Sequence, residues 1–110
     1  MPLPVTIVIP TLNEADQIAD CVRQVAWADE IIVADAGSTD GTVELAREAG
    51  ALVLEQTGPT IAAQRNAAIA RARNNWIFAL DADERFTDEL RTELAATLAG
   101  GSHSSAVLPR

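Results

Sequence analysis

The sequence contains no lysine and no tyrosine, and it has a single cysteine, Cys21, and a single histidine, His103. One cysteine cannot form a disulfide within the chain, and these two residues together cannot make a Cys/His zinc site. Without lysine there is neither the phosphate-binding lysine of a P-loop nor an amine for a Schiff base. Several common enzyme classes are therefore excluded before any motif is considered.

Other signals are missing as well. No Gly-x-Gly-x-x-Gly follows the first apolar run, so the dinucleotide-binding fingerprint is absent. The lack of lysine also argues against a response-regulator receiver domain and against the sugar nucleotidyltransferases. Apolar runs such as 5–10 and 76–80 are far shorter than the ~20 residues that span a bilayer, and the N-terminus lacks the basic start of a signal peptide. We expect a cytoplasmic protein, and peripheral membrane association stays open.

Positive charge is scarce: 8 arginines stand against 16 aspartates and glutamates, which gives a formal net charge of −8. This balance argues against nucleic-acid binding, which needs clustered basic side chains on the phosphate backbone. The chain of 110 residues is 48% apolar and 22% charged, a composition typical of one folded domain with its own core.

Strand-like and helix-like segments alternate along the chain. The run 5–9 (VTIVI) is β-branched and apolar, as in a strand buried on both faces of a parallel sheet, and we expect Pro10 to end it. The expected strands are 5–9, 30–34, 51–55 and 76–80, and the expected helices are 14–25, 41–49, 60–72 and 88–99. This order predicts an α/β fold, with a Rossmann-like parallel sheet of four strands and crossover helices. Beyond residue 100 we expect a flexible break carrying an exposed His103, then the start of another extended segment at 106–109.

Acidic residues follow three of the four strands. In an open parallel sheet, ligands bind beyond the carboxyl ends of the strands, where the strand order reverses. Asp35 follows the second strand, and Asp81 and Asp83 follow the fourth. If the chain is still extended there, Asp81 and Asp83 point to the same side and suit a hard divalent cation, Mg²⁺ or Mn²⁺.

Each of these features also has a purely structural interpretation. Thr11 to Glu14 matches a capping box, and residues 38–41 match an ordinary helix N-cap. A carboxylate at the end of a buried strand, as at Asp35, needs hydrogen bonds from a ligand or from backbone amides. Arg65 either forms a salt bridge with a helix neighbour or brings positive charge to the cleft for a phosphate. Cys21 is expected to be a small buried or half-buried residue.

Four stretches taken together resemble the family 2 glycosyltransferases, in the family's order and with similar spacing. They are 8–14 (VIPTLNE), 32–42 (IVADAGSTDGT), 63–66 (AQRN) and 80–84 (LDADE). The resemblance covers about residues 4 to 99 and implies the N-terminal half of a GT-A fold. Residues 27–30 and 83–85 look most like the branch that includes lipopolysaccharide-core sugar transferases.

The resemblance implies a role for each matching residue. Pro10, Thr11 and Glu14 would line the nucleoside pocket, and Asp35 would accept a hydrogen bond from the base, typically uracil. Arg65 would lie near the base or the diphosphate. Asp81 would face the ribose and the metal, and Asp83 would bind the metal directly. Mg²⁺ or Mn²⁺ would then bridge the carboxylates to the diphosphate of a nucleotide sugar, probably UDP-linked.

The resemblance further implies an inverting transfer of the sugar to a hydroxyl of an acceptor glycan or lipid-linked saccharide, as in cell-envelope polysaccharide synthesis. In the family a carboxylate base in the C-terminal half deprotonates that hydroxyl, so we expect the base beyond Arg110. We therefore expect residues 1–99 to form the nucleotide-sugar-binding half and residues 100–110 to be a flexible tail or the start of the missing acceptor half.

Two other hypotheses remain open. The chain could be a catalytically incomplete nucleotide-binding or interaction module whose exposed sheet edge pairs with another chain. It could also be an unrelated α/β domain in which the acidic turns only cap helices.

Overall fold

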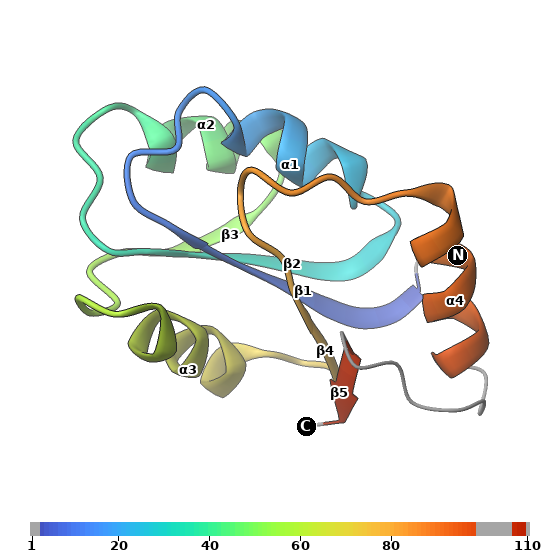
Figure 1. Cartoon of the computed structure of the whole chain (residues 1–110). Helices are drawn as coiled ribbons and strands as arrows, with labels where there is room; N and C mark the ends of the chain where they lie inside the picture. Colours follow the sequence, from blue (N-terminus) through green and yellow to red (C-terminus); the bar gives the residue numbers. More distant parts are fainter. Residues whose placement is uncertain (1–2, 99–106, 110) are drawn as a thin grey trace.

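One sheet runs through the molecule, with helices on both of its faces (Figure 1). The computed structural model describes residues 3–98 and 107–109, and within them five strands follow the order β3-β2-β1-β4-β5. The parallel strands are β1 (Leu3–Thr11), β2 (Ala28–Asp35), β3 (Leu52–Leu54) and β4 (Trp76–Ala79), and β5 (Val107–Pro109) is antiparallel to β4. The predicted α/β class and its four parallel strands are confirmed, and the predicted extended segment after residue 105 forms β5.

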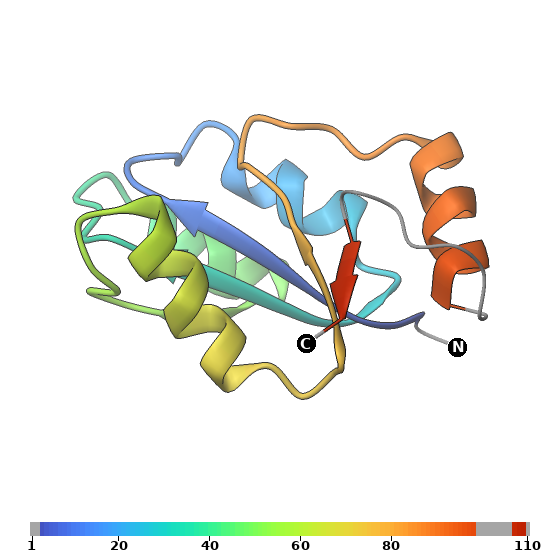
Figure 2. The same cartoon turned by 60° about the horizontal axis from the view of Figure 1, so that its bottom comes forward.

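The crossover connections place the helices in two layers. They are α1 (Ile18–Gln24), α2 (Thr42–Ala49), α3 (Ile61–Arg71) and α4 (Asp88–Leu98). Figures 1 and 2 show α1 and α2 together on one face of the sheet, α3 on the other, and α4 near the N-terminus. His103 and the break predicted around it lie outside the described residues.

The central strand β1 is buried on both faces, as its composition predicts. Its residues from Val5 to Thr11 are all buried. Ile7 and Ile9 join the larger apolar cluster, which includes Ile18 and Val22 of α1, because alternate side chains of a strand point to opposite faces. Val8 joins the smaller cluster beneath α3.

Two predicted boundaries were wrong. Pro10 does not end β1, since Pro10 and Thr11 still pair with Ala34 and Asp35 of β2. Alternate residues of a parallel strand bond to the same neighbour, and the Val8 carbonyl already bonds to the Leu80 amide on the β4 side. The missing N–H of Pro10 therefore faces the side on which the β4 ladder has ended, where proline is tolerated.

The first helix is also shorter than the predicted 14–25, because it begins at Ile18. The capping box does not form: Thr11 is still in β1 and its hydroxyl donates to Asp35, while the helix N-cap, Gln17, makes no side-chain capping bond. The remaining helices and strands lie within a few residues of their predicted bounds. Among the described residues, every helix is too short or too polar to cross a bilayer.

Candidate functional site

The strand order places a pocket at the carboxyl ends of the central strands. The chain runs outward from β1 through β2 to β3 and then returns to β4 on the other side of β1, so the order reverses between β1 and β4. A pocket of about 250 Å³, here called the switch-point pocket, opens there. Its walls are Pro10, Thr11, Leu12, Ala36, Pro59, Ile61, Gln64 and Asp81. Three of the predicted site residues, Pro10, Thr11 and Asp81, therefore line one cavity.

Asp35 lies next to this pocket and is almost fully buried, with 1% exposure. Its Oδ1 accepts from the hydroxyls of Thr11 (2.7 Å) and Ser38 (2.6 Å), and its Oδ2 accepts from the amides of Gly37 (3.0 Å) and Ser38 (2.7 Å). Burial raises the pKa of this carboxyl, but the hydrogen bonds from Ser38, Thr11 and Gly37 outweigh it and hold the pKa below 3.8. The need for hydrogen bonds predicted from burial is thus met within the chain.

The loops after β1 and β2 are tied to each other by reciprocal hydrogen bonds. The Asn13 amide donates to the Ser38 hydroxyl (2.7 Å), and the Thr39 amide donates to Asn13 Oδ1 (2.9 Å). Asn13 adopts a positive φ of 54°, a conformation that asparagine tolerates better than most residues. The Glu14 amide donates to the Thr42 hydroxyl at 2.9 Å. Glu14 therefore lies in this braced segment, outside the pocket wall.

Asp40 belongs to the same brace, and the N-cap predicted within residues 38–41 falls on Gly41 rather than on Asp40. That N-cap is Gly41, with φ of 93° and no side-chain capping bond. The Asp40 carboxylate accepts from the Thr42 amide and reaches across to the Ala15 amide at 3.1 Å. Hydrogen bonds from Thr42 and Ala15 hold the pKa of Asp40 below its ordinary value. The two carboxylates of the loop after β2, Asp35 and Asp40, thus accept hydrogen bonds from groups of the chain itself.

Arg65 extends from α3 toward the end of β4. Its Nη2 lies 3.9 Å from Asp81 Oδ1, and both side chains are about half exposed. The predicted alternative of a salt bridge to a helix neighbour is not seen among the described residues, because the partner of Arg65 comes from another element. Arg65 Nε is buried and has no hydrogen-bond partner in the described part of the chain. Positive charge and an unused donor therefore stand beside the pocket.

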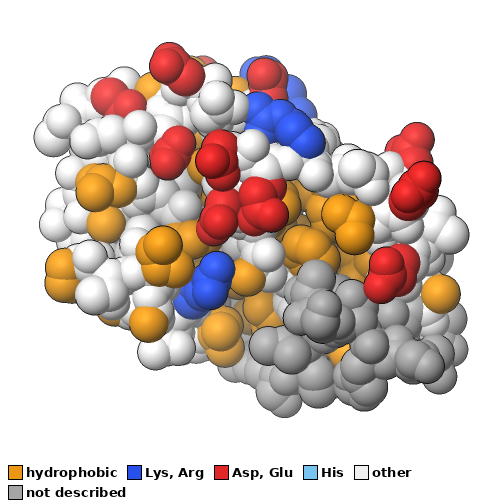
Figure 3. Space-filling model, in the orientation of Figure 1, with side chains coloured by type: hydrophobic (Ala, Val, Ile, Leu, Met, Phe, Trp, Pro, Cys, Tyr) orange, Lys and Arg blue, Asp and Glu red, His pale blue; other side chains and the backbone are white. Residues whose placement is uncertain are grey.

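The loop after β4, residues 80–87, carries the remaining predicted carboxylates. The chain turns here, with the Glu84 amide bonded to the Asp81 carbonyl (3.0 Å) and the Asp81 amide bonded to Glu84 Oε1 (2.7 Å). The condition for Asp81 and Asp83 to point the same way, an extended chain, is therefore not met. Within residues 3–98 and 107–109, no three metal-ligating side chains gather at one point. Acidic side chains are nevertheless concentrated on this face, where the loop runs (Figure 3).

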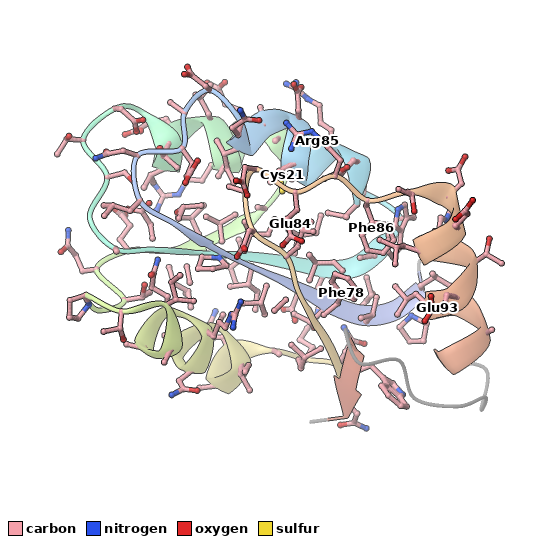
Figure 4. The ribbon with its side chains drawn as sticks, viewed as in Figure 1. Cys21, Phe78, Glu84, Arg85, Phe86 and Glu93 are labelled. Atoms are coloured by element: carbon pink, nitrogen blue, oxygen red, sulfur yellow. The ribbon has the colours of Figure 1, made fainter. Side chains whose placement is uncertain are left out.

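The β4 loop is fastened to α1 rather than to the other two loops. Gln24 Nε2 donates to the Glu84 carbonyl (3.0 Å), and Gln24 Oε1 accepts from the Phe86 amide (2.7 Å). Arg85 bonds to Gln17, and Figure 4 shows Arg85 beside α1, with Cys21 close to the loop. Cys21 is fully buried, as predicted, and burial raises its pKa to about 11, so the thiol stays protonated.

Sequence reasoning missed two glutamines that organise this end of the sheet. The sequence pattern predicts no role for Gln24, and Gln64 is notable there only as a member of the motif 63–66. Gln64 is buried, and its Nε2 donates to the carbonyls of Thr11 and Ala34, both at 2.9 Å. A polar residue inside the apolar stripe of the helix 60–72 was the one available signal, because such a residue must find partners when buried.

A family model, "Glycosyl transferase family 2", matches residues 6–110. The chain is 39% identical over 87 residues to an uncharacterized glycosyltransferase of Rickettsia felis, covering 78% of this chain and 31% of the relative. It is 34% identical over 102 residues to the lipopolysaccharide core biosynthesis glycosyltransferase LpsC of Rhizobium meliloti, covering 88% and 38%.

Solved structures show the same likeness. Glucosyl-3-phosphoglycerate synthase from Mycobacterium tuberculosis, in complex with Mn²⁺, UDP and glucosyl-3-phosphoglycerate, superposes with a TM-score of 0.67 at 26% identity, over 72% of this chain and 33% of that one. Mannosyl-3-phosphoglycerate synthase from Rubrobacter xylanophilus gives 0.74 at 26%, over 89% and 37%. The chain thus spans about a third of the length of these relatives. The predicted resemblance is confirmed: the chain belongs to glycosyl transferase family 2.

Proposed function

We propose that this chain binds the nucleotide-sugar donor of a glycosyltransferase, and that the whole protein transfers the sugar to an acceptor hydroxyl with inversion. The observation that carries the proposal is the switch-point pocket, with Asp81 in its wall and Arg65 paired to Asp81 at its edge. The similar M. tuberculosis synthase holds UDP and Mn²⁺. This supports a UDP-linked donor for the present chain as well.

Pro10, Thr11 and Asp35 form the nucleoside side of the proposed site, next to the braced loop that carries Glu14. Pro10 and Thr11 line the pocket, and the Thr11 hydroxyl donates a hydrogen bond to Asp35. Glu14 is held in the braced loop through its amide, which donates to Thr42. Asp35 accepts from a base only if the base displaces a hydroxyl from Oδ1, because its oxygens already accept four hydrogen bonds.

Arg65 is assigned to the diphosphate. A guanidinium presents several N–H donors in a fixed plane, which matches phosphate oxygens better than a point charge does. Its side chain is 44% exposed and its Nη2 lies beside Asp81, so the terminal guanidinium nitrogens can reach a phosphate oxygen. The pair with Asp81 is long, at 3.9 Å, and leaves the guanidinium free to turn toward a ligand.

The donor set suits Mg²⁺ or Mn²⁺ held jointly with a substrate. Asp81 and Asp83 offer carboxylate oxygens on an accessible turn, and the described residues form no complete cage. Such cations are often held by one or two carboxylates plus substrate phosphates. When bound, the cation would neutralise negative charge on the leaving diphosphate. Asp81 and Asp83 would hold it, and Arg65, beside Asp81, would orient the phosphates.

The acceptor is proposed to be a glycan or a lipid-linked saccharide, because of the likeness to a lipopolysaccharide core glycosyltransferase. The general base that receives the acceptor proton is proposed to lie beyond Arg110. In this proposal residues 1–99 form the donor-binding unit, and residues 100–110 lead toward the acceptor half.

Calorimetric titration of UDP tests the proposal. The wild-type chain should bind UDP at least roughly 10-fold more tightly with Mn²⁺ than without it, because the cation offsets the repulsion between the carboxylates and the diphosphate. Asp83→Ala should abolish the Mn²⁺ effect, whereas Asp20→Ala, which removes an exposed carboxylate from α1, should retain it. UDP binding that ignores both Mn²⁺ and Asp83→Ala would refute the metal role, and absence of UDP binding would refute the proposal.

The interaction-module hypothesis placed a contact with another chain at the free sheet edge. In the structure the outer edge of β4 is already paired with β5. Light scattering after size-exclusion chromatography separates the two ideas, because a monomer that binds UDP supports the donor-binding proposal, and a dimer without UDP affinity supports the interaction module.

A further inference from the structure

Gln24, the last residue of α1, holds the main chain of the β4 loop at two points. Its Oε1 accepts from the Phe86 amide at 2.7 Å, and its Nε2 donates to the Glu84 carbonyl at 3.0 Å. One loop group is a donor and the other is an acceptor, so both ends of the side-chain amide are used and only one orientation of it fits. We call this pair of bonds the Gln24 clamp.

The same face of α1 contacts the loop at two further places. Gln17, Cys21 and Gln24 are spaced by four and three residues, which brings them to one side of a helix. Cys21 Sγ donates to the Asp81 carbonyl at 3.8 Å, and Arg85 bonds to Gln17 (Figure 4). Of these contacts, the Gln24 clamp is the one that engages two main-chain groups with a single side chain.

The loop is also anchored by apolar packing on either side of the clamp. The Phe86 ring lies between Trp27 and Phe78, with ring centroids 5.0 Å and 5.1 Å apart. Ala82 is 3% exposed and belongs to the larger apolar cluster. These contacts hold side chains of the loop in the core, and the Gln24 clamp fixes the direction of the main chain between them.

The clamped main chain belongs to the turn that carries the two carboxylates. The Glu84 amide bonds to the Asp81 carbonyl at 3.0 Å, and Glu84 Oε1 accepts from the Asp81 amide at 2.7 Å. Glu84 therefore closes the turn that contains Asp81 and Asp83, and its carbonyl is the group that Gln24 holds. The side chain of Asp81 is half exposed and Asp83 is exposed, so their positions depend on the main chain beneath them.

We propose that Gln24 is a positioning residue for the divalent cation, because it fixes the turn from which Asp81 and Asp83 bind the ion. This inference rests on the proposed function and adds a residue that touches neither the cation nor the nucleotide. Metal ligands bind more tightly when residues behind them hold them in place, since the ordering of the loop then occurs during folding and not on binding.

The experiment measures Mn²⁺ binding to the full chain by EPR, in which the sharp signal of free Mn²⁺ is lost on binding, at a fixed high concentration of UDP. Gln24→Met keeps the length of the side chain but removes both hydrogen bonds. It should raise the Mn²⁺ dissociation constant roughly 10-fold. Its affinity for UDP without metal, measured by calorimetry, should stay at the wild-type value, because α1 contributes no residue to the wall of the switch-point pocket.

Asn74→Leu is the matched control. The Asn74 side-chain amide also makes two hydrogen bonds, to Thr6 and to Asp29, but it lies before β4, at the opposite end of the strands. This variant should keep the wild-type Mn²⁺ affinity whatever it costs in stability. An equal loss of Mn²⁺ affinity in Asn74→Leu and Gln24→Met would make the effect a general consequence of destabilisation and would overturn the inference.

A second variant and a second measurement cover poor folding of Gln24→Met. Gln24→Asn retains the amide but is one methylene shorter, so it cannot span the same two groups and should also weaken Mn²⁺ binding. Hydrogen exchange of the Phe86 amide should be faster in both variants, because its acceptor is lost. Unchanged Mn²⁺ affinity in both variants, or an equal fall in metal-free UDP affinity, overturns the inference. A wild type that binds neither Mn²⁺ nor UDP refutes the proposed function instead, so the two failures are distinguishable.

Discussion

The loops after β1 and β2 differ from the β4 loop in how their charges are used. Asp35 and Asp40 are occupied by hydrogen bonds from hydroxyls and amides of the chain, and both carboxyls have lowered pKa values. Asp83 of the β4 loop is exposed, and within the described part of the chain the Asp81 carboxylate has only the long contact to Arg65. Acidic residues at neighbouring strand ends thus serve different purposes: the first two build a rigid frame, and the others remain available to a ligand.

The largest expected effect is on stability and comes from the frame. Asp35→Ala should lower the free energy of unfolding by about 3–5 kcal/mol, because several buried donors lose their acceptor at about 1–3 kcal/mol each. Urea denaturation measures this change. Asp83→Ala is the matched substitution in the β4 loop and should change stability by no more than about 0.5 kcal/mol, as is usual for exposed positions. Equal losses in the two variants would remove the distinction between frame and ligand site.

A smaller effect should appear as a pH dependence. The folded-state pKa of Asp35 lies below its unfolded value of 3.8, so its contribution to stability is present above that pH and is lost as pH falls through the folded pKa. Urea titrations between about pH 5 and about pH 2 should show the wild type losing stability more steeply than Asp35→Asn, which has no proton to take up. Parallel curves for the two proteins would contradict the role of Asp35 as a charged acceptor.

The smallest effect on stability is expected at Arg65. Its ion pair with Asp81 is long and half exposed, so Arg65→Met should change the free energy of unfolding by only ~0–1 kcal/mol. The same variant should weaken UDP binding roughly 10-fold or more, because a charge-assisted hydrogen bond to phosphate is lost. Arg71→Met, an exposed arginine at the end of α3, is the control and should change neither property much. A large stability loss with unchanged UDP affinity would show that Arg65 has a structural role, like Asp35 and Asp40, and does not bind the ligand.

Much of the fold could be predicted because it depends on local patterns. The apolar run 5–9 marked the central strand, and the helix predicted at 41–49 is present as α2, with Gly50 at its C-cap. Pro10 was misjudged because its tolerance depends on where the neighbouring strand β4 ends. That boundary is a property of the sheet, and the residues next to Pro10 do not reveal it.

The candidate site divides in the same way. Its composition, with carboxylates after three strands and an arginine on the helix that precedes the fourth, was evident from the motifs. Whether each of these groups is paired or free was not evident, because the partners are distant in the sequence. Asp35 bonds to Thr11, Asp81 pairs with Arg65, and the β4 loop bonds to Gln24, which lies 60 residues before Glu84. The turn at Asp81, which removes the expected alignment with Asp83, is set by the Glu84 side chain bonding back to the backbone.

The sequence by itself determined the α/β class, the buried central strand, the family and the loops in which chemistry gathers, because apolar periodicity and motif order are properties of the chain. The tertiary structure decided which polar atoms are already paired and which remain free. Hydrogen bonds are short and directional, so only the sheet register and the packing of α1 and α3 could show that Asp35 is saturated and that the Gln64 amide nitrogen bonds to two carbonyls at the strand ends.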